Sequence, residues 1–339
     1  MSTSIRLGTR RSALAQAQSG HVAVALEKVT GRRVELVPIT SEGDTNRASL
    51  SEIGGMGIFA TRLREALLAG ECDFLVHSLK DLPTAVPAGL VIAATPARED
   101  ARDVVITRDG TPLHLLAPGS RIGTGAPRRM AQVRRRAPHA EVVDLRGNVD
   151  SRLQRVASGE LDAVILAAAG LSRLGGESPL HRDVTAPLHR EDLGLGEWPT
   201  APGQGSLAVE TRADADPELL AALGALDDER TRLAITVERA ILEGLDAGCQ
   251  APMAAHAAIT GDEVRVRTVV YAPDGAQRIG LDVTEVLNGG YIRRNGSGNG
   301  ADAADGADPM HAARALGLTL ARRLLDQGAA DLVSREHSS

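Results

Sequence analysis

Two kinds of apolar pattern alternate along the first hundred residues. Short runs rich in apolar and β-branched residues predict strands at 5–9, 33–40, 73–77 and 90–94. Between them, apolar residues recur at helical spacing, which predicts a helix capped by Ser12 that runs to about Thr30 and a second helix over 59–68. Strands that alternate with helices in this way are typical of an α/β layer with a largely parallel sheet.

The same alternation restarts after the charged stretch 97–102. It predicts strands at 103–107, 121–124, 141–145 and 162–168 and helices at 128–137 and 149–158. We therefore expect a second α/β unit of similar size. A loop region that contains prolines then leads to a predicted strand at 206–210 and a helix at 217–226.

The last third of the chain has a different order of elements. A helix at 229–244, strands at 253–259, 263–271 and 278–284, and a final helix at 310–326 predict a small α+β domain. The stretch 287–308 is rich in Gly, Asn, Ala and Asp and has no periodicity. We expect it to be a flexible surface insertion without a chemical role.

Composition places the chain among ordinary globular proteins. Its 339 residues (35.4 kDa) are 43% hydrophobic and 24% charged, which fits two or three domains and excludes a disordered protein. No apolar run approaches the ~20 residues of a membrane helix, so we expect no membrane span. The N-terminus lacks an apolar signal-peptide core and two cysteines cannot build a disulfide framework, so we expect a cytoplasmic protein.

The charge balance argues against nucleic acid as a partner. The net charge is −6 and aromatic residues make up 1%, whereas nucleic-acid binding favours cationic surfaces and stacking side chains. Among the 38 basic residues only Lys28 and Lys80 are lysines, a bias that a GC-rich coding sequence explains. A lysine kept inside a polar motif against this bias indicates a need for its compact ammonium group, and Lys80 is in such a motif.

That motif is the polar run His77-Ser78-Leu79-Lys80-Asp81-Leu82-Pro83, directly after a predicted strand. In open α/β sheets, ligands bind beyond the carboxyl ends of strands, which is where this run falls. Asp81 beside Lys80 offers a carboxylate with a nearby cation, a workable acid–base or cation-stabilising pair. A surface turn with solvated charges explains the run equally well, so its position leaves both interpretations open.

A second cluster consists of arginines. Ten arginines and no lysine fall within 121–173. Five of them follow predicted strands or begin the next helix: Arg128, Arg129, Arg146, Arg152 and Arg173. Helix N-termini favour anions, and the planar guanidinium group binds carboxylates or phosphates bidentately. An acidic protein with few aromatic residues favours a polycarboxylate ligand over nucleic acid; residues 134–136 are expected on a solvated face.

The two cysteines have different settings. Cys249 lies in the loop-like segment Gly248-Cys249-Gln250-Ala251-Pro252, where a thiol is accessible, whereas Cys72 leads into an apolar strand and is expected in the core. An accessible thiol can be a nucleophile or an attachment point, although a spare loop cysteine is the commoner outcome. The nine histidines are scattered and no Cys/His pair has ligand spacing, so no metal site is predicted.

Eight ordered blocks carry a resemblance to a known family. They are Gly8-Thr9-Arg10-Arg11-Ser12, Gly54-Gly55-Met56-Gly57-Ile58-Phe59, His77-Ser78-Leu79-Lys80-Asp81, Arg128-Arg129, Leu145-Arg146-Gly147-Asn148, Ala169-Gly170-Leu171-Ser172-Arg173, Pro202-Gly203-Gln204-Gly205 and Gly248-Cys249-Gln250-Ala251-Pro252. With these blocks in this order and at matching spacing, the chain closely resembles the porphobilinogen deaminase (hydroxymethylbilane synthase) family over nearly its whole length.

The resemblance implies an α/β fold of three domains. Two α/β domains resemble the halves of a periplasmic-type binding protein with the site in the cleft between them, and a smaller C-terminal α+β domain follows. The chain would pass from the first to the second near 97–102 and return near 199–205. We expect domain 1 at 1–98 and 203–226, domain 2 at 99–202 and domain 3 at 227–339.

The resemblance also implies a transferase of tetrapyrrole biosynthesis, the pathway to heme and other porphyrins. Family members join four molecules of porphobilinogen head to tail, release four ammonia and then hydrolyse hydroxymethylbilane free. Growth starts from a dipyrromethane cofactor held by a thioether to a cysteine, which corresponds to Cys249. The expected protein is a cytoplasmic monomer without a nucleic-acid or membrane partner.

Site residues are carried over by the resemblance alone. Asp81 corresponds to the catalytic carboxylate. The cofactor-binding positions besides Cys249 are Asp44, Ser78, Lys80, Arg128, Arg129, Arg146 and Gly147. The substrate-binding positions are Arg10, Ser12, Arg146, Arg152, Arg173 and Gln204.

The chemistry agrees with that assignment. Loss of ammonia from an aminomethyl pyrrole leaves an azafulvenium cation, which a nearby carboxylate can stabilise while it handles protons. Each pyrrole carries two carboxylates, so a chain of six rings carries twelve. An acidic protein can hold that charge by concentrating arginine in one cleft.

The sequence also departs from the family pattern. Glu52 and Met56 stand where many members have lysine, and Ala126 stands where a serine is often found, so no binding role is carried onto these three residues. The stretch 287–308 is not part of the usual pattern either. The competing hypothesis is a non-catalytic two-lobed binding protein for a polycarboxylate ligand, against which Cys249 and the missing signal-peptide pattern both speak.

Overall fold

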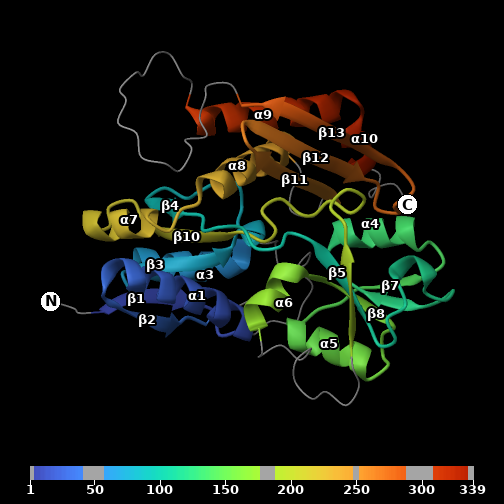
Figure 1. The fold of residues 1–339 in the computed structure, drawn as a ribbon, viewed down its shortest axis with the longest axis horizontal. Helices are drawn as coiled ribbons and strands as arrows, with labels where there is room; N and C mark the ends of the chain where they lie inside the picture. Colours follow the sequence, from blue (N-terminus) through green and yellow to red (C-terminus); the bar gives the residue numbers. More distant parts are fainter. Residues whose placement is uncertain (1–3, 41–56, 176–187, 247–251, 288–307, 335–339) are drawn as a thin grey trace.

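Three β-sheets, each with its own helices, organise the chain in a computed structural model (Figure 1). The structure describes residues 4–40, 57–175, 188–246, 252–287 and 308–334. Two sheets have five strands and the third has three. We call the parts built on them the first lobe, the second lobe and the C-terminal unit.

The first lobe contains strands from both sides of the second lobe in the sequence. Its sheet has the order β2-β1-β3-β10-β4. The strands are β1 (Ser4–Thr9), β2 (Arg33–Pro38), β3 (Phe74–Ser78), β4 (Leu90–Ala94) and β10 (Leu207–Arg212). The helices are α1 (Ala13–Thr30), α3 (Gly57–Leu68) and α7 (Pro217–Gly224), and the short 3₁₀ turn η1 (Leu79–Asp81) follows β3 directly.

Local chemistry explains where α1 begins and ends. The side chain of Ser12 accepts a hydrogen bond from the Ala15 backbone N–H, which satisfies one of the free donors at the helix start. At the other end, Gly31 adopts a left-handed conformation, and its N–H donates to the Glu27 carbonyl. The buried face of α1, including Val22 and Leu26, packs in the core of the first lobe.

The second lobe is continuous in sequence. Its sheet has the order β7-β6-β8-β5-β9. The strands are β5 (Asp103–Thr107), β6 (Arg121–Gly123), β7 (Glu141–Val143), β8 (Ala163–Ala167) and β9 (His189–Leu193). The helices are α4 (Pro127–Arg136), α5 (Val149–Ala157) and α6 (Ala168–Leu174), with a 3₁₀ turn η2 (Leu113–Leu115).

The two lobes share one topology. In each sheet, the strand that comes first in the parallel part lies between two parallel neighbours: β1 between β2 and β3, and β6 between β7 and β8. An antiparallel strand, β10 or β5, then lies between that part and the last strand of the sheet. Both antiparallel strands follow a passage of the chain from one lobe to the other. This is the two-lobed α/β architecture that the resemblance implied.

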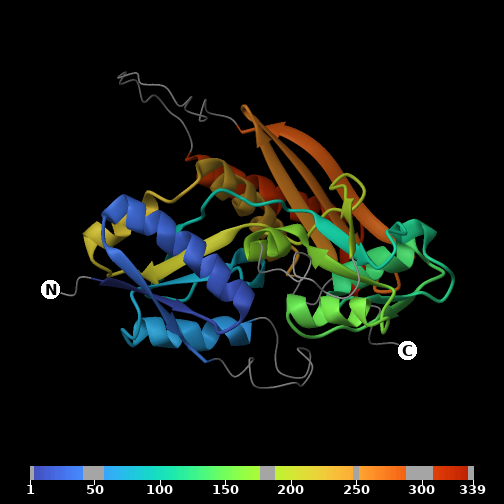
Figure 2. The ribbon, with the colours of Figure 1, turned by 60° about the horizontal axis from the view of Figure 1, so that its bottom comes forward.

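The C-terminal unit packs two long helices on a meander of three antiparallel strands. It contains α8 (Glu229–Gly244), β11 (Met253–Thr260), β12 (Glu263–Tyr271), β13 (Arg278–Val286), α9 (Pro309–Asp326) and α10 (Ala329–Ser334). Gly317 of α9 permits close helix packing, because a Cβ there would lie 2.5 Å from the Val237 carbonyl oxygen of α8. Figure 2 shows α8 and α9 side by side under the long sheet strands.

The three parts meet where the chain passes between the lobes. We call residues 95–102 the first crossing and residues 199–206 the second crossing. The crossings bond to each other through Glu99 N–H, which donates to the Gly205 carbonyl. Glu238 of α8 is fully buried and accepts from the Arg98 guanidinium (2.6 Å) and the Gly203 N–H (2.6 Å). A single carboxylate from the C-terminal unit therefore fixes both crossings.

The predicted elements agree with the structure in most places. Both large sheets are largely parallel, as predicted, but each is mixed, because β10 in the first lobe and β5 in the second lobe run antiparallel to both of their neighbours. Helix α6, strand β9 and helix α10 were not predicted. Cys72 is fully buried, as predicted. The predicted insertion falls almost entirely outside the described residues.

Candidate active site

The candidate catalytic residues lie on the 3₁₀ turn η1, at the carboxyl end of β3. Strand β3 is almost wholly buried between β1 and β10, so it fixes where the turn begins. Leu79 anchors the turn, because its side chain is fully buried and its N–H donates to the Ser206 carbonyl of the second crossing. The side chain of Asp81 is exposed, and Lys80 is partly buried. The turn therefore presents a carboxylate to the space between the lobes with an ammonium beside it.

Lys80 connects the first lobe to the second crossing. Its Nζ donates to the Gln204 side-chain oxygen at 3.2 Å. Burial and the positive charges of Arg129 and Arg128 lower the pKa of Lys80 to about 8, although Asp81 and Asp103 act in the opposite direction. A bound anion would therefore stabilise the ammonium form of Lys80.

Arg128 and Arg129 begin α4 and are both buried. They share one carboxylate: Arg128 Nη1 lies 2.8 Å from Asp103 Oδ2, and Arg129 Nη2 lies 2.6 Å from Asp103 Oδ1. Burial alone would raise the pKa of Asp103, but the two guanidinium groups hold it well below its usual range. Two guanidinium groups and one carboxylate therefore give this buried set of three residues a net positive charge.

Further hydrogen bonds complete the surroundings of Asp103. The indole N–H of Trp198 donates to Oδ2 at 2.9 Å, and the Gln204 amide donates to Oδ1 at 2.8 Å. The same amide donates to the Ala101 carbonyl at 2.8 Å, so Gln204 joins both crossings. With 1% exposure, Gln204 lies inside this network and not on an open wall.

Arg146 and Arg152 lie around the start of α5. The Asn148 side chain caps this helix by accepting from the Ser151 N–H at 2.9 Å. Gly147 has φ 110°, and a Cβ there would lie 2.3 Å from Ser151 Oγ, so only glycine fits this turn. Arg152 donates from Nε to the Gly147 carbonyl at 2.8 Å, and Arg146 is exposed.

Three more predicted positions gather where α1 meets α6. Arg10 and Ser12 precede α1, and the first turn of α1 approaches α6, since a Cβ on Gly170 would lie 3.6 Å from the Leu14 side chain. Arg173 is on α6 and donates to the Gly205 carbonyl at 2.6 Å. Ser78, at the end of β3, exchanges hydrogen bonds with Gln18 of α1.

Electrostatic coupling shows which of these groups share one space. Burial, together with repulsion from Arg129 and Arg146, lowers the pKa of Arg152 to about 10, while Asp144 and Asp81 oppose this shift. Asp81 thus lies near cations from both lobes. The members of this cationic cluster are Lys80, Arg128, Arg129, Arg146 and Arg152. The arrangement can bind several carboxylates and offers one carboxylate to a cation formed among them.

Sequence reasoning missed several residues that build this site. Asp103 was assigned only to a strand, although an acidic residue at the start of a wholly buried strand was a signal that it needs cationic partners. Its partners Trp198 and Gln204 are 95 and 101 residues away, a distance that no local pattern spans. Glu238 gave no signal of its own on a helix with several charged residues.

The candidate cofactor positions Asp44 and Cys249 lie outside the described residues, as do Glu52 and Met56. Within the described ranges, no three His, Cys, Asp or Glu side chains are grouped as a metal ion requires. The helices that are described include none long and apolar enough to cross a membrane.

Comparison with known proteins places this geometry in a family. Residues 5–220 match the model "porphobilinogen deaminase, dipyromethane cofactor binding domain", and residues 232–326 match "porphobilinogen deaminase, C-terminal domain". Porphobilinogen deaminase 1 of Streptomyces coelicolor is 50% identical over 338 residues, with 97% of both chains covered. Porphobilinogen deaminase of Leifsonia xyli is 46% identical, covering 97% of this chain and 94% of its own.

A solved structure, the VFT2 domain of Bordetella pertussis BvgS, aligns with 66% of this chain and 87% of its own. Its identity is 17% and the TM-score is 0.41. The sequence matches extend over both lobes and the C-terminal unit, and they do not favour a non-catalytic binding protein. The chain belongs to the porphobilinogen deaminase family.

Proposed function

We propose that this protein joins four porphobilinogen molecules head to tail on a dipyrromethane linked to Cys249, and then hydrolyses the linear tetrapyrrole free. Membership of the family makes it a transferase of tetrapyrrole biosynthesis with a dipyrromethane cofactor. The observation that carries the detailed proposal is the convergence of the cationic cluster on the exposed carboxylate of Asp81.

The cationic cluster fits a ligand with many carboxylates. Arg128 and Arg129 share the single carboxylate of Asp103, and both Lys80 and Arg152 have lowered pKa values from burial and from neighbouring cations. Bound carboxylates relieve this repulsion, and guanidinium groups receive them bidentately. When bound, the dipyrromethane supplies the electron-rich pyrrole carbon at which a new unit is added.

We propose one set of contacts for the cofactor and one for the substrate. For the cofactor we assign Lys80, Ser78, Arg128, Arg129, Arg146, Gly147 and Asp44. For substrate acetate and propionate groups we assign Arg10, Ser12, Arg146, Arg152, Arg173 and Gln204. Since Gln204 is buried and bonded to Lys80 and Asp103, its support for substrate passes through the orientation of Lys80.

Asp81 is the proposed catalytic residue. When ammonia leaves the aminomethyl group of porphobilinogen, the carbon left behind shares a positive charge with the pyrrole nitrogen. The Asp81 carboxylate, exposed beside Lys80, stabilises this charge. A pyrrole carbon then forms a bond to the charged carbon, and Asp81 accepts the proton that this pyrrole carbon loses. The surrounding cations bind the substrate's carboxylates and so orient the substrate. They leave the positive charge that forms at the reacting carbon to be stabilised by Asp81.

Intact mass of the purified protein tests the attachment of the cofactor. The wild type is expected to carry the added mass of two pyrrole units, and Cys249→Ser is expected to lose it together with activity. Cys72→Ala is the matched control, because burial raises the pKa of Cys72 to about 11 and so keeps that thiol protonated. An unmodified wild-type mass with full activity would overturn the proposal.

Asp81→Asn tests the catalytic role. The amide fills the same space but supplies neither charge nor base, so turnover should fall by about 10²–10⁴-fold while the protein stays folded. The dipyrromethane mass should be kept, because its carboxylates are held by the cationic cluster. Turnover within a few-fold of the wild type would move the catalytic role to another group.

The remaining features are proposed with their own support. We propose a cytoplasmic monomer that acts without a nucleic-acid or membrane partner. The net charge of −6 supports the absence of a nucleic-acid partner, and the buried free thiol of Cys72 supports a reducing compartment. We propose domain boundaries near 98, 202 and 226, which fall close to the two crossings and to the start of α8.

A further inference from the structure

The turn that carries Asp81 is fastened from the C-terminal unit. Arg239 of α8 donates three hydrogen bonds to consecutive backbone carbonyls directly after Asp81. Nη1 bonds to the Leu82 carbonyl at 3.1 Å, and Nη2 bonds to the carbonyls of Pro83 at 2.6 Å and Thr84 at 3.1 Å. One guanidinium group therefore fixes the path of the chain as it leaves the turn.

Apolar contacts from the same helix support the other side of the turn. Leu79 and Leu82 are buried in a small cluster with Ala60, Ala208 and Ile235. Ile235 lies one turn before Arg239 on α8, so the two side chains point to the same side of the helix. Leu82 N–H closes the turn on the Leu79 carbonyl at 3.0 Å. Side chains of α8 thus contact both the leucine side chains of the turn and the backbone that follows it.

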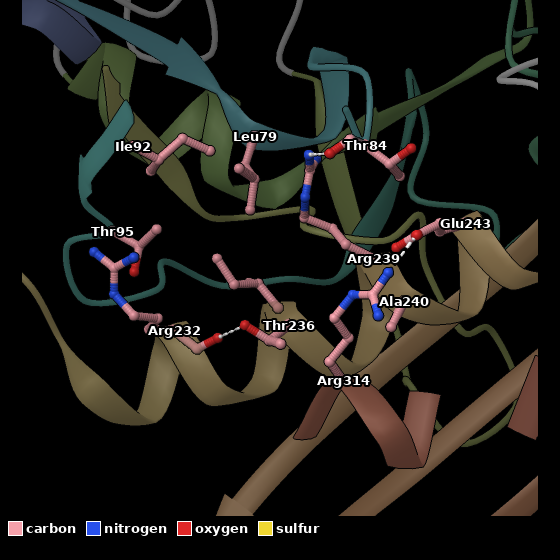
Figure 3. A pocket seen from close by; sticks show the side chains of 11 residues that line it. Leu79, Thr84, Ile92, Thr95, Arg232, Thr236, Arg239, Ala240, Glu243 and Arg314 are labelled. Carbon is pink, nitrogen blue, oxygen red and sulfur yellow. Dashed lines mark hydrogen bonds and ion pairs between the residues drawn. The ribbon is translucent and has the colours of Figure 1, made fainter. Parts of the chain in front are cut away.

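A cavity beside the turn shows how Arg239 reaches these carbonyls. Figure 3 shows the Arg239 side chain crossing the cavity from α8 toward Thr84, with Leu79 and Ile92 of the first lobe on the opposite wall. Arg314 and Glu243 pair with each other at 2.5 Å at another side of the same cavity. Three hydrogen bonds hold the end of the Arg239 side chain on the far side of this cavity.

The same helix leads to the cofactor cysteine. Helix α8 ends at Gly244, five residues before Cys249. We propose that Arg239 is a positioning residue, which holds the Asp81 turn in a fixed relation to α8 while substrate units are added. This inference rests on the proposed function, because it assumes that Asp81 is catalytic.

The physical basis is the strong distance dependence of catalysis by a positioned group. A displacement of about 1 Å in a reacting group can cost about 10²-fold in rate. Because the guanidinium group is charged, its hydrogen bonds to these three carbonyls are stronger than those of a neutral donor. Without Arg239, the turn keeps its buried leucines, but the chain after Asp81 loses three bonds at once.

Kinetics of Arg239→Gln, Arg239→Lys and the control Arg314→Gln test this role. Arg239→Gln is expected to lower kcat by about 10–100-fold with KM within about twofold, and to keep the dipyrromethane mass. Arg239→Lys, which keeps charge and donors, should recover part of kcat. Arg314→Gln removes an exposed ion pair from the same cavity and should leave kcat unchanged.

A double-mutant cycle with Asp81→Asn separates positioning from general stability. If Arg239 acts through Asp81, adding Arg239→Gln to Asp81→Asn should reduce kcat no further, whereas independent roles would multiply. Multiplying effects, or near-wild-type kcat in a folded Arg239→Gln protein, would overturn this inference alone. If Arg239→Gln does not fold, the same cycle is run with Arg239→Lys. Near-wild-type turnover of Asp81→Asn would instead overturn the proposed catalytic role of Asp81.

Discussion

At the scale of single residues, the choice between lysine and arginine follows the surroundings. Arg128 and Arg129 are buried and satisfy Asp103 with planar, permanently charged groups. Lys80 is the one cation of the cationic cluster whose charge can change near neutral pH, because its pKa is lowered to about 8. Its compact ammonium donates to the Gln204 side-chain oxygen and has three donors to satisfy, whereas a guanidinium group has five.

Lys80 is assigned to the cofactor, but it belongs to the same cationic cluster as Arg146 and Arg152, which are assigned to the substrate. The charge of Lys80 therefore predicts a pH dependence of substrate binding as well. Bound carboxylates favour the ammonium form and raise the pKa of Lys80, so binding takes up a proton above pH 8. KM for porphobilinogen should be flat below about pH 8 and rise above it, by up to about tenfold per pH unit. Lys80→Arg should remove the rise that Lys80 causes, since a guanidinium group keeps its charge.

The measurement is KM from pH 7 to 9.5 for both proteins. Titration of the substrate's own amino group affects the two proteins equally, so the difference between their profiles isolates Lys80. A wild-type KM that stays flat, or the same rise in Lys80→Arg, would contradict the role of the ammonium.

At the scale of elements, the two crossings depend on one glycine. Gly205 has φ 89°, and a Cβ there would lie 2.4 Å from the Glu99 carbonyl oxygen. Gly205→Ala should therefore destabilise the protein by about 2 kcal/mol or more, since it combines backbone strain with a clash against backbone. The midpoint of thermal unfolding should fall by several degrees.

Gly20 in α1 provides the matched control. A Cβ at Gly20 meets nothing within 4 Å, so Gly20→Ala should raise stability by about 0.5–1 kcal/mol through better helix propensity. The single tryptophan, Trp198, is buried near the second crossing, so its fluorescence reports the thermal unfolding of both variants. A Gly205→Ala protein as stable as Gly20→Ala would contradict the close approach of the crossings.

Elements with strong periodicity were predictable from the sequence. Strands β4, β5 and β12 and helix α8 begin and end where the pattern predicted. Strand β9 was missed because four of its five residues are polar (His-Arg-Glu-Asp-Leu), as edge strands often are. Helix α6 was missed because it follows β8 with no intervening loop and contains Gly170.

The residue types of the candidate site were predictable from the sequence, but the hydrogen bonds and ion pairs that connect them were not. The polar run around Asp81 and the arginines of the second lobe were visible as local clusters. The network around Asp103 was not, because its partners come from α4, from Trp198 and from the second crossing, and only the fold brings them together. The hydrogen bonds from Arg239 to the Asp81 turn span 155 to 157 residues and left no trace in any local pattern.

At the scale of the whole molecule, α8 is the element that relates all three parts. Glu238 holds both crossings, and the neighbouring Arg239 holds the Asp81 turn. The second lobe contacts the C-terminal unit separately, through a small cluster in which Ala131 of α4 packs with Tyr271 of β12. The first lobe and the C-terminal unit are thus tied by buried polar bonds, which favour one fixed relation between them.

The position of β10 also sets the order in which the molecule can be assembled during translation. All five strands of the second lobe lie between Asp103 and Leu193, so that lobe is complete as soon as its own stretch has left the ribosome. The first lobe is made earlier but must wait, because β10 (Leu207–Arg212) belongs between β3 and β4. Until then the nascent chain exposes the unpaired edge of β3, the strand that leads to Asp81, and this edge is a surface for mispairing that chaperones would have to protect.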